Sequence, residues 1–242
     1  MKDQVPSEAS LAQLRLDVAL ETTPKKAFAT AVDWPGLSRS GRTREIALEA
    51  AQACLPRYAA VLARIDPGLA PPSRVVAAFR AGRADLNIIE EGVGGAGTEF
   101  GVPSRVTAAD RRGASADDAN RLAEIVAAAW TTFDAVVASA PAELRKGPRG
   151  GGRDRDRIVG HVTESDHAYA REIGVRLKAP APGDRAAIQA MRAAILDVLR
   201  RPSDGAPLAD RRWTTRYAAH RVAWHALDHA WEIEDRTEPA AG

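Results

Sequence analysis

Residues 216–236 read RYAAHRVAWHALDHAWEIEDR and indicate a helix near the end of the chain. Within it, His225 and His229 are four residues apart, so a helix places both imidazoles on one face, one turn from each other. Two imidazoles in that arrangement can share one metal ion, because each ligand bond is only about 2.0–2.1 Å long. Ala226 stands where a zinc-protease motif carries its general-base glutamate, so metalloprotease chemistry has no support. A chance pair on a helix surface has the same spacing and stays an alternative.

Three further helical segments precede this one. Ser115 and Asp118 approximate a capping box, apolar residues then follow i, i+3, i+4 spacing, and Pro141 ends the run. The four helices are expected over about residues 115–140, 154–177, 183–200 and 210–235. Four helices of about 20 residues with short loops are typical of a four-helix bundle.

The N-terminal part of the chain follows a different pattern. Residues 14–20 alternate between apolar and polar side chains, which predicts a strand. Residues 27–33 predict a second strand, and Pro35 and Gly36 must end it because proline cannot donate to a ladder.

A helix is expected after these two strands. Thr43 is its predicted N-cap, Pro56 is expected to kink or divide it, and Asp66-Pro67-Gly68 ends it. Residues 74–110 are expected to return to β structure, in which the glycines of residues 92–97 form a hairpin or turn.

Together these patterns predict an α+β fold in two parts. A small N-terminal αβ module is expected over residues 11–112, and a four-helix bundle over residues 113–238. The first ten residues are polar and read as a loose tail.

Composition excludes several classes of protein. The chain has 242 residues, 45% hydrophobic and 27% charged, which is enough apolar material for a core and excludes wholesale disorder. Lys and Arg number 34 against 32 Asp and Glu, so the chain lacks the basic excess of a general nucleic-acid binder. No signal core or membrane span is recognised, and we expect a cytoplasmic protein without a membrane partner. The single cysteine, Cys54, excludes an intramolecular disulfide and Cys-rich zinc sites.

A third histidine is a candidate to complete the metal site. All five histidines follow residue 160, and His161 lies near the start of the second predicted bundle helix. A bundle can bring His161 opposite the pair on the last helix, which would leave coordination positions open for water or substrate. Neutral imidazole suits Zn, Ni, Fe or Cu. His167 and His220 are rotated off the ligand face by the helical repeat.

The segment IVGHVTESDHAY, residues 158–169, together with residues 216–236 resembles the DinB-like superfamily of damage-inducible proteins and mycothiol- or bacillithiol-dependent transferases. The resemblance covers about residues 115–236. It implies an up-down-down-up bundle in which His161, His225 and His229 hold a divalent metal (Zn, Ni or Fe). It also implies thiol-dependent chemistry with a cofactor such as mycothiol, although no motif here identifies the thiol.

Three further side chains are candidates for catalysis. Glu164 lies one turn after His161 and is expected either to accept a hydrogen bond from a ligand or bound water, or to face solvent. Tyr217 and Arg221 lie eight and four residues before His225, and so form a stripe towards the metal pair. Arg221 is expected either to hold a substrate carboxylate or to pair with an acid on a neighbouring helix.

A basic, glycine-rich loop precedes the His161 helix. Residues 145–157 hold six basic and two acidic side chains. The loop lacks the Lys-Ser/Thr end of a P-loop, so it is expected to be solvated or to cover the site.

Residues 28–41, with the helix that follows, resemble the HicB-like fold. The resemblance implies a module used for oligomer contacts, such as a homodimer, or for partner binding. No ribbon-helix-helix or helix-turn-helix arm is attached, which weakens a DNA-binding role.

Three hypotheses of function follow. The first is a metal-dependent enzyme of the DinB-like superfamily, a transferase, isomerase or hydrolase acting on a small molecule. The second is a non-catalytic stress or regulatory protein with a structural metal, and the third is a HicB-like partner-binding protein. Three ligands with open positions favour the first, because structural zinc is usually four-coordinate.

Overall fold

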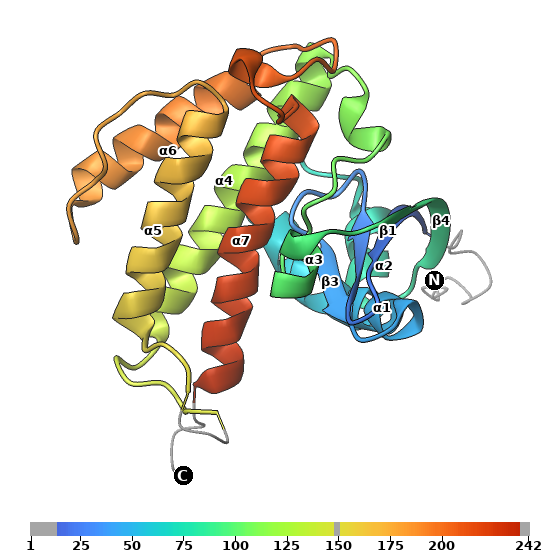
Figure 1. The fold of residues 1–242 in the computed structure, drawn as a ribbon, viewed down its shortest axis with the longest axis horizontal. Coiled ribbons are helices and arrows are strands. Elements are labelled where there is room, and N and C mark those ends of the chain that lie inside the picture. Colours follow the sequence, from blue (N-terminus) through green and yellow to red (C-terminus); the bar gives the residue numbers. More distant parts are fainter. Residues whose placement is uncertain (1–13, 148–150, 238–242) are drawn as a thin grey trace, which may run out of the picture.

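The computed structural model of the chain describes residues 14–147 and 151–237. It confirms the mixed α+β class: within these residues it has seven α-helices and one four-stranded sheet (Figure 1). The expected N-terminal tail lies outside the described residues, as do positions 148–150 of the glycine-rich loop and the outermost residues of both predicted parts.

The sheet has the strand order β3-β2-β1-β4. Strands β1 and β2 are antiparallel, as are β2 and β3, whereas β1 and β4 are parallel. The strands span Arg15–Thr22 (β1), Ala27–Ala31 (β2), Ser38–Gly41 (β3) and Asp85–Val93 (β4). The parallel pair requires a crossover, and the helices between β3 and β4 provide it.

Helix α1, Arg44–Leu62, begins where it is expected and packs on one face of the sheet. The side chain of Thr43 accepts a hydrogen bond from the amide of Ile46, which confirms the predicted N-cap. Pro56 lies inside the helix without dividing it. The next helix, α2, covers Ser73–Arg80.

The expectation of β structure from residue 74 is therefore wrong for α2. The spacing of a short apolar run does not distinguish a helix from a strand. Here the run forms a helix, and Pro72 is its N-cap residue. The helix buries Phe79 completely, against the rings of Trp34 at 4.8 Å and Tyr58 at 5.6 Å. The expected hairpin at residues 92–97 is also wrong, because the chain leaves β4 and enters helix α3, Ala96–Phe100.

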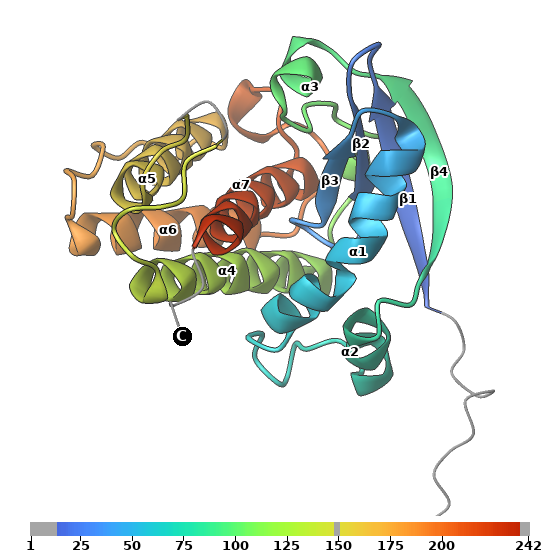
Figure 2. The ribbon, with the colours of Figure 1, turned by 90° about the horizontal axis from the view of Figure 1, so that it is seen from below.

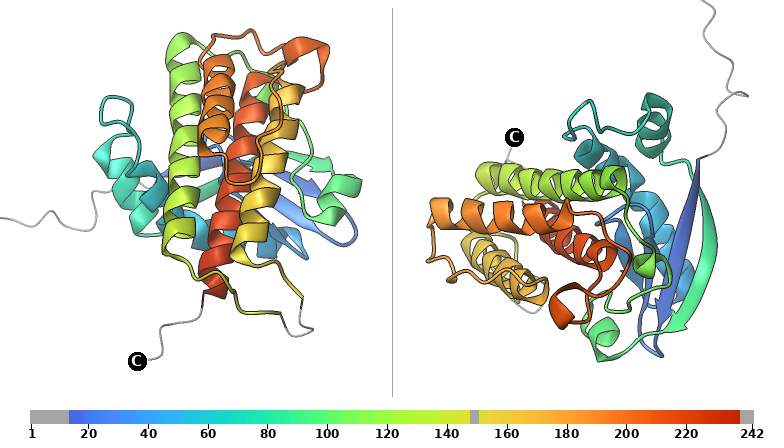
Figure 3. Two further views of the ribbon diagram at one scale, coloured as in Figure 1. Left: turned by 90° about the vertical axis from the view of Figure 1, so that its left-hand side faces the viewer. Right: turned by 90° about the horizontal axis from the view of Figure 1, so that it is seen from above.

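Four helices form the helical part: α4, Ala116–Ser139; α5, Arg155–Glu172; α6, Arg185–Leu199; and α7, Thr215–Arg236. They run side by side (Figure 3), and α4 packs most extensively on α7. The Ser115–Asp118 capping box is confirmed.

Two of these helices are shorter than expected. Helix α5 ends five residues early, because Gly174 adopts a φ of +86° that a helix does not allow. Helix α7 starts at Thr215 instead of residue 210, since Ala209 and Asp210 have left-handed backbone angles and Thr214 caps the helix. Short 3₁₀ turns, η2 at Ala109–Arg111 and η3 at Leu208–Asp210, lie before α4 and α7.

Helix α7 lies between the sheet and the other helices of the helical part (Figure 2). The rings of Phe28 on β2 and Trp224 on α7 meet edge to face, 6.2 Å apart. Arg39 on β3 forms an ion pair of 2.9 Å with Asp228 on α7. The largest apolar cluster contains residues of both predicted parts, and a smaller cluster lies within the N-terminal part alone.

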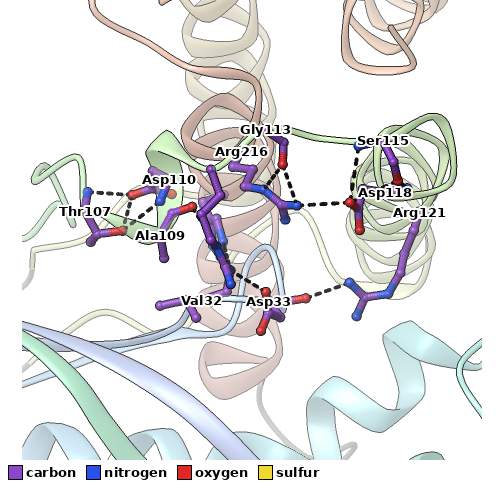
Figure 4. A network of polar contacts seen from close by, with 12 residues as sticks. Val32, Asp33, Thr107, Ala109, Asp110, Gly113, Ser115, Asp118, Arg121 and Arg216 are labelled. Carbon is purple, nitrogen blue, oxygen red and sulfur yellow. Dashed lines mark hydrogen bonds and ion pairs between the residues drawn. The ribbon is translucent and has the colours of Figure 1, made fainter. Parts of the chain in front are cut away.

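Polar contacts reinforce the same junction (Figure 4). Arg112 pairs with the carboxylate of Asp33 at 2.7 Å, and Arg121 donates to the carbonyl of Asp33 at 2.9 Å. Arg216 donates to the carbonyl of Gly113 and pairs with Asp118. The loop after β2 is thereby fastened to the start of α4.

Helix α4 is long and apolar enough, by length and composition alone, to cross a membrane. We did not expect a segment of this kind from the sequence. Half of its apolar window is buried inside the protein, including Ile125 and Phe133, and burial accounts for its composition.

A buried carboxylate lies at the centre of the helical part. Asp166 of α5 is fully buried and accepts a hydrogen bond of 2.9 Å from the indole of Trp130. The guanidinium of Arg192 lies 3.8 Å away and pairs with Asp134 at 2.7 Å. Burial raises the pKa of Asp166 to about 7, although Arg192 and the Trp130 hydrogen bond oppose the shift.

We expect Asp166→Asn to flatten the pH dependence of stability. The folded state keeps the Asp166 proton up to about pH 7, whereas the unfolded chain loses it near 3.8. The folded state therefore binds more protons between these values, and the free energy of unfolding falls as pH rises through this window. Asparagine can still accept from Trp130 but does not titrate. Urea denaturation of both proteins between pH 4.5 and 8 measures the difference.

Asp156→Asn is the matched control, because Asp156 is an exposed carboxylate on the same helix. It should follow the wild type. An Asp166→Asn variant with the wild-type slope would contradict the assignment of this proton.

Candidate metal centre

Three histidines from two helices converge between α5 and α7. His161 comes from α5, and His225 and His229 come from successive turns of α7. Their ring centroids are 4.6–5.0 Å apart, and one nitrogen of each ring lies within 4.8 Å of the others. The structure thus brings together all three predicted metal ligands.

The spacing of the nitrogens suits a shared metal ion. Two nitrogens held at about 2.0–2.1 Å from a tetrahedral ion lie about 3.3 Å apart. The Nε2 atoms of His161 and His225 are separated by 3.2 Å. A hydrogen bond between the two rings has a similar length, so the fit rests on the third ring as well as on this distance.

The environment keeps two of these rings in the form that binds metals. Burial lowers the pKa of His225 to about 2, and the neighbouring His229 and His161 lower it further in the same direction. Burial also lowers the pKa of His161. Only neutral imidazole is a ligand, so at pH 7 a metal need not displace a proton from either ring.

His229 is oriented by a carboxylate that the sequence analysis missed. Its Nδ1 donates to Oε2 of Glu232 at 2.7 Å, and Arg236 donates to Oε1 of the same carboxylate at 2.7 Å. The hydrogen bond to His229 and the charge of Arg236 lower the pKa of Glu232. Nε2 of His229 is left to face the other two rings, which is the usual arrangement around a metal-binding histidine.

Glu164 does not take this role in the structure. It is exposed on α5, and among the described residues it forms no hydrogen bond with the three histidines. The signal for Glu232 was present in the sequence, because it lies three residues after His229 on the same helix.

Two aromatic rings, those of Tyr169 and Trp224, lie between the guanidinium of Arg221 and the histidine cluster. That guanidinium is 5.2 Å from the ring centre of Tyr169 and 4.9 Å from that of Trp224. Tyr169 in turn contacts His225 edge to face at 5.6 Å, so it is a site neighbour that the sequence analysis did not single out. Tyr217 packs on Trp213 at 5.2 Å and lines a cavity towards the sheet.

The other two histidines lie outside the cluster, as expected. Nε2 of His167 bonds to the carbonyl of Leu177, and Nε2 of His220 donates to the carbonyl of Val32 at 2.9 Å. Cys54 is buried in α1, and burial raises its pKa to about 11, so it stays a thiol at pH 7.

The basic loop contributes charge to the site through Arg153. The positive charge of Arg153 is among the causes that lower the pKa of His161 and of His225. Arg153 is itself exposed, and the described parts of the loop flank the start of α5.

No protein-family model, curated protein or solved structure matches this chain.

We expect Glu232→Ala to weaken metal binding about 10- to 100-fold, because the ring of His229 loses the acceptor that fixes it. Zinc affinity measured by competition with a chromogenic chelator checks this. Glu164→Ala is the matched control, since it removes a glutamate from the facing helix, and its affinity should equal that of the wild type. Equal affinities of all three proteins would contradict the role of Glu232.

Proposed function

We propose that this chain is a divalent-metal-dependent enzyme that acts on a small molecule, with His161, His225 and His229 holding the ion. The observation that carries the proposal is the convergence of three imidazoles from α5 and α7. Zn, Ni and Fe all suit such a ligand set. When bound, the metal supplies Lewis acidity towards a thiol, a water or a substrate carbonyl.

The number of ligands supports catalysis over a structural metal. Within the described residues, the group contains three side chains and no fourth histidine, cysteine or carboxylate close enough to join them. Structural zinc sites usually have four protein ligands, whereas catalytic sites keep a position for water or substrate. A metal that only holds α5 to α7 remains the rival hypothesis.

We extend the proposal to the family and the class of reaction. The chain is proposed to be a DinB-like four-helix bundle preceded by a HicB-like module, and its reaction to be a transfer, an isomerisation or a hydrolysis. The order of the helices and the two histidine segments support the bundle. The proposal of a low-molecular-weight thiol cofactor such as mycothiol rests on the resemblance alone. No nucleic acid is proposed as a partner, and a homodimer through the N-terminal module is part of the proposal.

The first test is the metal content of the purified, untagged protein by elemental mass spectrometry. We expect about one divalent metal ion per chain, lost in His225→Ala because two imidazoles hold the ion too weakly. His167→Ala is the matched control: its histidine lies on α5 with His161 but bonds to the carbonyl of Leu177. It should retain the metal.

Two results would overturn the proposal. The absence of metal, with no uptake of Zn or Ni when either is supplied, removes the metal site. A retained metal whose X-ray absorption spectrum shows four protein ligands removes the catalytic role and leaves a structural one. Three nitrogen ligands with additional light scatterers support catalysis and justify a screen of thiol-dependent reactions.

A further inference from the structure

The cavity that Tyr217 lines lies between α7 and the sheet. It is lined by residues of β1, β2 and α7 and by the segment that follows α3. Its volume is about 30 Å³. One water-sized group needs about 10–15 Å³, so the cavity has room for about two of them. None of the three candidate metal ligands lines it.

Hydrogen-bond donors without a partner are concentrated at this cavity. Buried nitrogens of Arg105 (Nη1), Arg221 (Nη1) and Trp224 (Nε1) have no acceptor among the described residues, and all three residues line the cavity. Each of these nitrogens can only donate. Nδ1 of His220 is also unpartnered within the described chain, but it accepts in the neutral ring because Nε2 donates to Val32.

Two carboxylates also line the cavity, those of Glu21 and Asp110, and both already accept hydrogen bonds from neutral donors. Glu21 accepts hydrogen bonds from the hydroxyl of Thr98 and from the amides of Ser104 and Arg105. Asp110 accepts from the amide and the hydroxyl of Thr107. The cavity thus has N–H donors without partners, whereas its carboxylate oxygens already accept hydrogen bonds.

Arg221 is the guanidinium at the cavity that forms no ion pair with any described residue. In the part of the chain that the structure describes, no carboxylate oxygen lies within 4.0 Å of its guanidinium nitrogens, and its neighbours are the rings of Tyr169 and Trp224. Arg105, by contrast, pairs with Glu90 through its other terminal nitrogen. A largely buried guanidinium is stabilised by an anion that can accept from it.

We propose that this cavity binds the carboxylate group of a small organic anion, with Arg221 as its main charged donor and Arg105 and Trp224 as further donors. Two carboxylate oxygens match the room for two water-sized groups. Water can also fill the space, but it cannot neutralise the guanidinium, so the charge of the occupant distinguishes the two.

The residues proposed to bind the carboxylate are not the residues proposed to bind the metal. Arg221 and His225 are four residues apart on α7, so Arg221 lies one turn from His225 on the same face of the helix, and the cavity adjoins the histidine cluster. The cavity needs no metal for its charge or its donors. The inference therefore goes beyond the proposed function and does not depend on it.

The test is a titration of the full-length protein with sodium acetate, at an ionic strength held constant with sodium chloride. Acetamide is the neutral probe of nearly the same shape. The readout is the indole N–H signal of Trp224 in a ¹H–¹⁵N spectrum, assigned by its loss in Trp224→Phe. We expect acetate to shift this signal to saturation, and acetamide to leave it in place.

Variants separate this site from the metal centre. Arg221→Gln should weaken acetate binding about tenfold or more, since a charge-assisted hydrogen bond is lost, and Arg105→Gln should weaken it as well. Arg153→Gln is the matched control, because Arg153 is exposed and does not line the cavity. His229→Ala should remove metal binding and leave the acetate titration unchanged.

Circular dichroism of each variant verifies folding before the titration. Three results would overturn the inference: no saturable shift with acetate, equal shifts with acetate and acetamide, or an unchanged acetate affinity in folded Arg221→Gln and Arg105→Gln. The first two assign the cavity to water or to neutral ligands. The third shows that the two guanidinium groups do not contribute to acetate binding.

Discussion

The burial of α7 on nearly all sides is the constraint on which the rest of the structure depends. The helix meets the sheet through Trp224 and meets α4 and α5 on its other faces. Small side chains permit this close packing, and five alanines of α7 are fully buried: Ala218, Ala219, Ala223, Ala226 and Ala230. The same burial withdraws His225 from water and keeps its imidazole neutral. Packing and metal-binding chemistry thus have one physical cause.

The sequence predicted the parts of the site that follow helical periodicity. His225 and His229 lie on one face because their spacing is four, and His161 was expected opposite them. For Glu164 two alternatives were open, a hydrogen bond to the site or a solvent-exposed position, and in the structure it is exposed while Glu232 contacts His229. Glu164 and Glu232 both lie three residues from a ligand, and only the rotation of each helix in the folded protein decides which one reaches it. The α2 segment was missed because five apolar residues fit a strand and a helix equally well.

The carboxylates of the sheet part serve mainly to fasten loops. Glu21 holds the segment after α3, Asp110 holds the turn at Thr107, and Asp33 ties the loop after β2 to α4. These contacts join residues that are 70 or more positions apart or lie in irregular segments, so no local pattern reveals them. The donors of the cavity come from such distant segments too, which is why the cavity could not be foreseen from the sequence.

Gly36, in the loop between β2 and β3, packs directly against α7. It has a φ of +91°, and a Cβ atom there would be 2.7 Å from Cδ1 of Leu227 and 3.2 Å from Cβ of Ala223. The loop can pack this closely on α7 only because residue 36 has no Cβ atom. Any larger side chain would have to displace Leu227 or Ala223, and the positive φ would strain the backbone as well. Because Ala223 precedes Trp224, such a displacement would act on the residue next to one that lines the cavity.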